Sequence, residues 1–132
     1  FAPDMRVINV GCDGLEDMVE RGALRARSTV ALLERHLAPV RGSGADVVGL
    51  GCTHYPFLRG RIKSMLGPGV RVYDPSRPVA RRVRQLLAEA DALASDGAAE
   101  YRWFTTGDAA VFRVVASKLL RFPVQDVRRI QI

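Results

Sequence analysis

A thiol, a hydroxyl and an imidazole stand on three consecutive residues, Cys52, Thr53 and His54. The apolar run at 47–50 predicts a short buried strand, and the apolar spacing after Pro56 predicts a helix. We therefore expect Cys52 in a strand-to-helix turn, where free backbone N–H groups and the helix dipole stabilise negative charge. Such a turn, with an imidazole two residues away, lowers the pKa of a thiol. Cys52 is thus a candidate thiolate.

The residues alone leave several chemical roles open for Cys52, namely nucleophile, redox centre, metal ligand or base in proton transfer. Redox chemistry is disfavoured because no second cysteine lies three residues away. Zinc is disfavoured because the two cysteines and two histidines, which include Cys12 and His36, do not follow a ligand spacing. Acyl transfer stays open, although cysteine hydrolases usually recruit their histidine from elsewhere in the chain. The non-chemical alternative is a small buried core residue.

The neighbours of Cys52 each have a structural and a functional interpretation. Thr53 is either a turn-capping hydroxyl or, with the N–H groups of the turn, a holder of a carboxylate. Tyr55 is by default a packed ring. His54 is a polar turn residue or, beside a thiol, a group that handles a proton. Glu20 is by default a surface charge in the last turn of a helix, and Cys12 is more a structural than a catalytic residue.

The composition indicates a globular chain that binds neither nucleic acid nor a membrane. Hydrophobic residues make up 48% of the 132 residues, and the formal net charge is +6. The basic residues are scattered, without the interleaved aromatic side chains of a base-stacking surface, and the densest group, at 77–84, fits a solvated helix face. No apolar run has the length of a membrane span, and the start does not resemble a signal peptide. We expect a cytoplasmic chain with two free thiols.

Strand-like and helix-like segments alternate along the whole sequence. Strands are predicted at 7–10, 47–50, 70–73, 101–106 and 127–132, and helices near 14–21, 28–41, 58–66, 76–90 and 108–120, with a polar loop at 94–99. This alternation predicts an α/β fold with mostly parallel strands and flanking helices. Ligands of such folds bind beyond the carboxyl ends of the strands, where Cys12, Cys52, Asp74 and Thr105 fall.

Local signals predict where several of these helices begin. Asp13 followed by Glu16 predicts a capping box for the first helix, and Ser28 predicts the N-cap of the second. Asp108 after a glycine predicts the start of the last. The helix near 76–90 carries an apolar stripe from Val79 onward at helical spacing.

The segment Leu-Gly-Cys-Thr-His-Tyr-Pro at 50–56 is similar to the second-cysteine motif of glutamate racemases, the cofactor-independent enzymes that supply D-glutamate for peptidoglycan. Segments at 11–22, 45–46, 74–76 and 104–108 resemble the same family, so the resemblance covers nearly the whole chain. Related aspartate and hydantoin racemases carry glutamate at the position of the histidine in this motif, which favours glutamate as the substrate. The departures are Asp13 in place of a common proline and Phe57 in place of leucine.

The resemblance also implies which part of the family fold is present. The amino-terminal motifs of the family, an Asp-Ser-Gly turn, a Pro-Tyr-Gly turn and an Asn-Thr segment with the first catalytic cysteine, do not occur in this sequence. We therefore expect the carboxy-terminal portion of a two-domain, pseudo-symmetric racemase. By analogy, 1–74 belong to the second domain, and 75–132 return to complete the first.

The resemblance implies a two-base mechanism without cofactor or metal. Cys52 then acts on one face of glutamate, His54 tunes its proton, Thr53 binds the substrate and Glu20 supports His54, while the opposite cysteine lies outside this chain. On this basis the chain alone is expected to be inactive, and its open strand edges predict a homo-oligomer. Two alternatives are a non-catalytic α/β binding or assembly module and a cysteine-dependent hydrolase or transferase.

Overall fold

The computed structural model describes residues 4–95, 97 and 99–131, and the chain divides into two compact units, Phe1–Pro75 and Ser76–Ile132. In both units helices accompany a pair of parallel strands, which confirms the predicted α/β class. The predicted division after residue 74 lies beside the junction of the units. The assignment of each unit to one domain of a larger fold stays a prediction.

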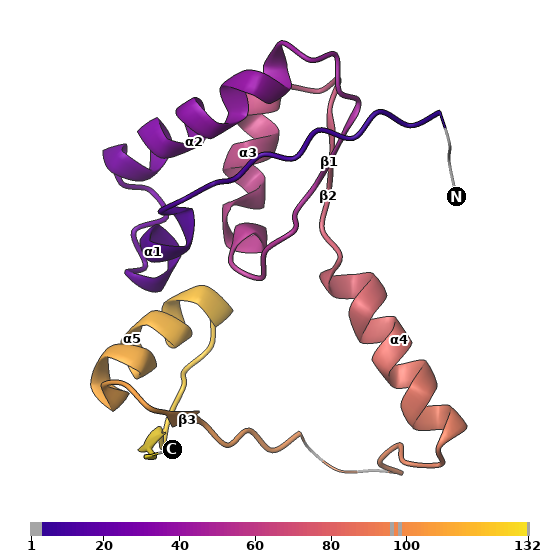
Figure 1. Cartoon of the computed structure of the whole chain (residues 1–132). Coiled ribbons are helices and arrows are strands. Elements are labelled where there is room, and N and C mark those ends of the chain that lie inside the picture. The colour runs from indigo at the N-terminus through magenta and orange to yellow at the C-terminus, as the bar shows by residue number, and fades with distance from the viewer. Residues whose placement is uncertain (1–3, 96, 98, 132) are drawn as a thin grey trace. The chain divides into compact units, whose positions relative to one another are not determined.

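The first unit contains a short parallel sheet with its helices on one side (Figure 1). Its elements are α1 (Leu15–Glu20), α2 (Arg27–Arg41), β1 (Val47–Gly49), the 3₁₀ helix η1 (Tyr55–Leu58), α3 (Arg59–Leu66) and β2 (Arg71–Tyr73). Val48 of β1 is paired with Val72 of β2. Backbone bonds extend the ladder at both ends, from Arg71 N–H to Asp46 O (2.8 Å) and from Leu50 N–H to Tyr73 O (3.0 Å).

The core of the first unit fixes α1 against η1 and α2. Its buried apolar side chains are Leu15 and Val19 of α1, Leu33 and Leu37 of α2, Leu50, Leu58, Ile62 and Val72. The one buried polar residue recorded among the described residues is Thr29, whose hydroxyl donates to Ala23 O at 2.7 Å. This bond ties the start of α2 to the turn after α1. The carboxyl end of α1 is thereby held beside η1.

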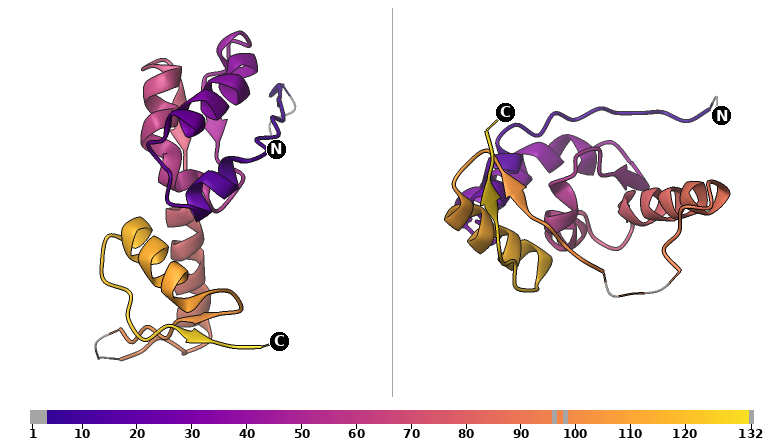
Figure 2. Two further views of the ribbon diagram at one scale, coloured as in Figure 1. Left: turned by 90° about the vertical axis from the view of Figure 1, so that its left-hand side faces the viewer. Right: turned by 90° about the horizontal axis from the view of Figure 1, so that it is seen from below.

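The second unit contains α4 (Ser76–Glu89), β3 (Phe104–Thr105), α5 (Ala109–Leu120) and β4 (Arg128–Arg129). β3 and β4 pair in parallel, and α5 lies beside β3 (Figure 2). The predicted start of the last helix is confirmed, and Asp108 caps it, since its Oδ1 accepts from Val111 N–H at 2.8 Å. Trp103 packs among three other rings, those of Tyr101, Phe112 and Phe122.

The prediction of a strand at 7–10 is wrong for this chain. The residues carry no strand pairing, and Val7 is 68% exposed. A strand exists only where a neighbour accepts its backbone bonds, and none of the described strands pairs with this segment. The other outer strands are shorter than predicted for the same reason, because β3 and β4 have only each other to pair with. Residue 132 of the last predicted strand, and 96 and 98 of the predicted loop, lie outside the described residues.

Two predicted caps are also wrong. Gly14, at a φ of 85°, is the N-cap of α1, and Asp13 makes no cap bond. Only half of the predicted capping box forms, since Glu16 Oε1 accepts from Gly14 N–H at 3.3 Å. α2 begins one residue before Ser28, and its N-cap, Ala26, donates its N–H to Ala23 O. The turn between α1 and α2 therefore sets the start of α2.

The sequence predicts more burial for β1 than the structure shows, and the apolar stripe of α4 is exposed. Val47 is 45% exposed, because helices cover only one side of the strand pair. α4 buries none of its residues, and its stripe Val79, Val83, Leu86 and Leu87 is exposed. Helical spacing indicates which side chains share a face, but a face is buried only where another element covers it.

Candidate active site

The turn after β1 presents Cys52, Thr53 and His54 at the carboxyl end of the strand. Backbone bonds close the turn, from Tyr55 N–H to Cys52 O and from Phe57 N–H to His54 O, both 3.2 Å. Pro56 stands in the first turn of η1, where the absence of an N–H has no cost. Cys52 and His54 are half-buried, whereas Thr53 is exposed. The predicted strand-to-helix turn is confirmed, with a 3₁₀ turn preceding α3.

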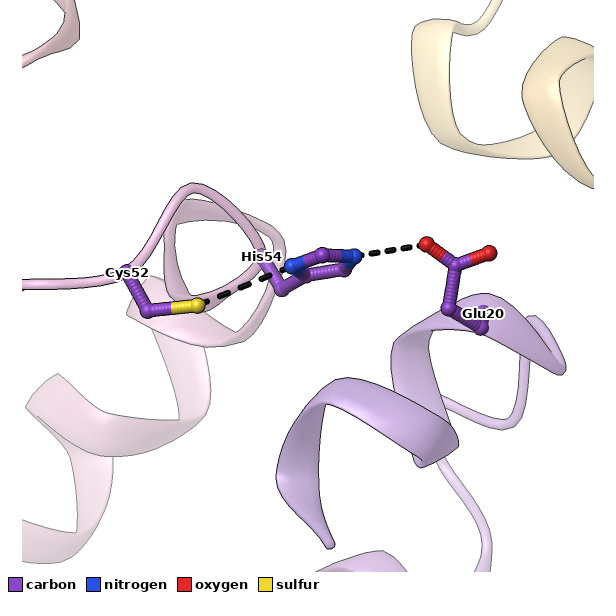
Figure 3. Close-up of polar contacts among 3 residues, drawn as sticks. All are labelled: Glu20, Cys52 and His54. Atoms are coloured by element: carbon purple, nitrogen blue, oxygen red, sulfur yellow. Dashed lines mark hydrogen bonds and ion pairs between the residues drawn. The ribbon is translucent and has the colours of Figure 1, made fainter. Parts of the chain in front are cut away.

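Cys52, His54 and Glu20 form one linear chain of contacts (Figure 3). Cys52 Sγ lies 3.6 Å from His54 Nδ1, and His54 Nε2 lies 2.6 Å from Glu20 Oε1. Glu20 is the last residue of α1, and the packing of α1 against η1 brings it to the imidazole from 34 positions away in the sequence. The structure thus brings together the three residues that the sequence proposed as catalytic.

The electrostatics of this chain favour a thiolate paired with an imidazolium. The backbone N–H of His54 lowers the pKa of Cys52 most strongly; burial opposes this effect, and the His54 side chain adds a smaller lowering. The hydrogen bond to the Glu20 carboxylate, followed by the bond to Cys52, raises the pKa of His54. A doubly protonated imidazole donates from Nδ1 to the thiolate and from Nε2 to the carboxylate. The lowered pKa of Cys52 and the raised pKa of His54 therefore support each other.

The second thiol is in the opposite state. Burial raises the pKa of Cys12, and its thiol lies 3.6 Å from Val10 O, an acceptor that favours the protonated form. Burial also raises the pKa of Tyr55 to about 12, with the nearby thiols adding to the effect. Burial therefore favours the protonated forms of Cys12 and Tyr55, whereas the hydrogen bonds to Cys52 favour its thiolate form.

Two further contacts near the site have no signal in the sequence. His36 of α2, to which the sequence gave no role, has its Nε2 3.1 Å from Asp13 O, just before α1. Arg61 Nε of α3 donates to Leu24 O at 3.0 Å, in the turn after α1. Both contacts hold the segments around α1. They join residues more than twenty positions apart, so no local pattern predicts them.

No group of three or more histidine, cysteine, aspartate or glutamate side chains in the described part of the chain is arranged to hold a metal ion. Among the described helices, none is both long enough and apolar enough to cross a membrane. Asp74, which follows β2 at the same end of the sheet as Cys52, is half-buried. The role of Thr53 as a carboxylate-binding residue stays a prediction.

No family model matches the chain, but curated relatives match most of it. Glutamate racemase from Herpetosiphon aurantiacus is 43% identical over 115 residues, which are 85% of this chain and 44% of the relative. Glutamate racemase from Ectopseudomonas mendocina is 38% identical over 120 residues, 91% of this chain and 46% of the relative. The chain is homologous to a carboxy-terminal portion of glutamate racemase. It spans about half the length of the curated relatives that it matches.

Solved glutamate racemases share the fold. The isoform RacE1 from Bacillus anthracis matches 98% of this chain with a TM-score of 0.87 and 26% identity, over 48% of its own length. The racemase from Francisella tularensis, solved in complex with D-glutamate, also matches 98% of the chain and 48% of its own length, with a TM-score of 0.84 and 25% identity. These matches confirm the predicted resemblance and the prediction that about half of a racemase fold is present.

Proposed function

We propose that this chain carries one half of the active site of a glutamate racemase, with Cys52 as the proton-transfer base for one face of the substrate. The observation that carries the proposal is the contact chain from the Cys52 thiol through His54 to Glu20, which stabilises a thiolate. The relatives of this portion are glutamate racemases, and one solved relative is in complex with D-glutamate.

The proposed chemistry is the inversion of an α-carbon by two proton transfers. The Cys52 thiolate takes the α-proton, so a C–H bond breaks, an S–H bond forms and the electron pair stays on the substrate, delocalised into its carboxylate. A protonated group on the opposite face then delivers a proton to the same carbon. In the reverse direction the Cys52 thiol is the donor. Thr53 and the N–H groups of the turn bind the substrate carboxylate where negative charge develops.

His54 and Glu20 set the protonation of Cys52 on this proposal. A base works best when its pKa is near the working pH, and an ordinary thiol titrates too high for that. The backbone and imidazole donors of His54 lower the pKa of Cys52, and the Glu20 carboxylate raises the pKa of the imidazole. In this proposal Cys52 and His54 also contact the substrate, and Glu20 acts through His54.

The remaining parts of the proposal concern what lies beyond this half-site. The group acting on the opposite face belongs to the amino-terminal part of the family fold, and no pyridoxal cofactor takes part. Residues 1–74 belong to the second domain and 75–132 complete the first, which gives the exposed apolar stripe of α4 a cover. The biological role is the supply of D-glutamate for peptidoglycan in the cytoplasm.

The first test is direct. L-glutamate is incubated with the 132-residue chain and its circular dichroism is followed over time; we expect no change, because a single base cannot invert the carbon at a useful rate. Rapid loss of optical activity would overturn the half-site proposal. In a two-domain racemase that contains this sequence, Cys52→Ala should abolish turnover in both directions, while Cys12→Ser should retain it. Activity in the Cys52→Ala enzyme would remove Cys52 from the mechanism.

A non-catalytic assembly module is the second candidate, and the exposed stripe of α4 is the observation that favours it. An apolar stripe of this kind promotes association of copies. The two candidates differ in what they require of Cys52. A thiol with an ordinary pKa, in a chain that self-associates and does not bind glutamate, would support the module.

A further inference from the structure

A groove of about 430 Å³ lies between α3 and β2, away from the cysteine turn. Arg59 and Lys63 of α3 line it together with Arg71, the first residue of β2, and with Asp46, which precedes β1. Asp46 and Arg71 mark the amino-terminal ends of the two strands, whereas Cys52 follows the carboxyl end of β1. None of the residues proposed to bind glutamate lines the groove.

The charge of the groove is strongly one-sided. Three cationic side chains face one carboxylate in its lining. All three cations are exposed, and among the described residues no carboxylate lies within 4.0 Å of any of them. Their charge is therefore not neutralised locally, and it adds to a field that attracts anions.

The outer edge of β2 has no strand partner among the described strands. Arg71 N–H and Tyr73 C=O bond to residues flanking β1. Because backbone groups alternate in direction along a parallel strand, the N–H of the intervening Val72 is directed toward the other edge. Val72 also lines the groove. A groove lined by two arginines and a lysine has donor groups that bind an oxyanion.

We propose that this groove binds a diphosphate group, free or as part of a nucleotide. A multiply charged oxyanion matches three separated cations better than a single carboxylate does, and arginine pairs with phosphate oxygens through two parallel bonds. The volume admits a group larger than one phosphate. The Asp46 carboxylate opposes the anion and limits its affinity. The inference is independent of the racemase proposal.

The test is calorimetric titration of the 132-residue chain with sodium pyrophosphate at low ionic strength. Because the cations are exposed, each one should contribute about as much binding free energy as a surface ion pair does. Arg71→Gln and Lys63→Gln should therefore each weaken the affinity for pyrophosphate about twofold to fivefold. Arg84→Gln, an exposed site on α4, makes the same change in net charge and should leave the affinity unchanged. Asp46→Asn should tighten binding, whereas Glu34→Gln on α2 should not.

Several outcomes would overturn the inference. Equal weakening by Arg84→Gln would mean diffuse attraction by a basic chain, and an Asp46→Asn variant that binds no tighter would remove the groove from the explanation. Absence of binding, or displacement of pyrophosphate by L-glutamate, would do the same. If Arg71→Gln fails to fold, as judged by far-ultraviolet circular dichroism, Lys63→Gln carries the comparison. Titration with ADP distinguishes a nucleotide from a free diphosphate as the ligand. Tighter binding of ADP than of pyrophosphate would indicate that the groove also recognises the nucleoside, and equal binding would indicate that it recognises the diphosphate alone.

Discussion

Replacing Glu20 by glutamine tests the link between α1 and the catalytic turn. The carboxylate oxygen is 2.6 Å from His54 Nε2, but the Glu20 side chain is 69% exposed and that of His54 29%. Solvent therefore screens the pair, and its contribution to the free energy of unfolding is that of a surface ion pair, about 0.2–1 kcal/mol. Glutamine keeps the size and loses the charge. The expected destabilisation of Glu20→Gln lies in this range.

The pH dependence of the loss follows from the raised pKa of His54. A group whose pKa is raised in the folded state contributes stability that is fully present below its unfolded pKa, about 6.5, and is lost as pH rises through the folded pKa. Glu20→Gln should therefore lower stability at pH 5.5 more than at pH 9. Urea unfolding followed by circular dichroism at both pH values measures the difference. With a urea dependence of about 2 kcal/mol per molar, the midpoint should fall by up to about 0.5 M at pH 5.5.

Glu34→Gln is the matched control, because Glu34 is an exposed glutamate on the neighbouring helix α2 and its change alters the net charge equally. It should change the midpoint little at either pH. A loss for Glu20→Gln that is the same at pH 5.5 and pH 9, or no greater than that of Glu34→Gln, would refute the charged contact between His54 and Glu20.

Two further substitutions test the packing that positions the site, and a third tests association through α4. Thr29→Val removes the buried hydroxyl that donates to Ala23 O, and this carbonyl keeps the Ala26 N–H as a second partner. The free energy of unfolding should therefore fall by about 0.5–1.5 kcal/mol. Hydrogen exchange of the amides of α2 measures the loss, with α5 as an internal reference. Leu58→Ala empties a fully buried position in η1 and should destabilise by about 2–5 kcal/mol in urea unfolding, with no loss contradicting the core assignment. Leu86→Glu places a charge in the exposed apolar stripe of α4. If copies of the chain associate through that stripe, the substitution should lower the sedimentation coefficient. An unchanged coefficient for a self-associating chain would show that association does not use this stripe.

The sequence predicted the turn that carries Cys52, Thr53 and His54 better than it predicted the surrounding contacts. Cys52, Thr53 and His54 are consecutive, so one local pattern places all three in a turn after a strand. Glu20 lies 34 positions from His54, and no periodicity brings them together. The family resemblance named Glu20 because evolutionary similarity preserves contacts between distant residues. The contacts of His36 and Arg61, which have no such motif, were not predicted.

The fold errors have a common physical origin. The strand predicted at 7–10 and the apolar stripe of α4 both have the correct local pattern, and both are uncovered in this chain. Sequence pattern reports what a segment is able to pair with or bury, whereas the outcome depends on whether a partner is present. The chain covers 48% of the solved racemase RacE1. On the proposed division into two domains, the rest of such a fold would cover these segments. The predicted N-caps Asp13 and Ser28 are wrong for a different reason. Gly14 in a left-handed conformation fixes the start of α1, and the turn before α2 fixes the start of that helix.

The central claim is that Cys52 is a thiolate stabilised by His54, and the rate of Cys52 alkylation against pH tests it most directly. In a Cys12→Ser background, iodoacetamide reacts only with Cys52, and the midpoint of the rate profile reports its pKa. We predict a midpoint below the ordinary thiol value of about 8.5. His54→Ala should raise the midpoint only part of the way back, because the backbone N–H at position 54, the largest cause of the shift, remains in alanine. A midpoint at or above the ordinary value, or one that His54→Ala leaves unchanged, would contradict the claim.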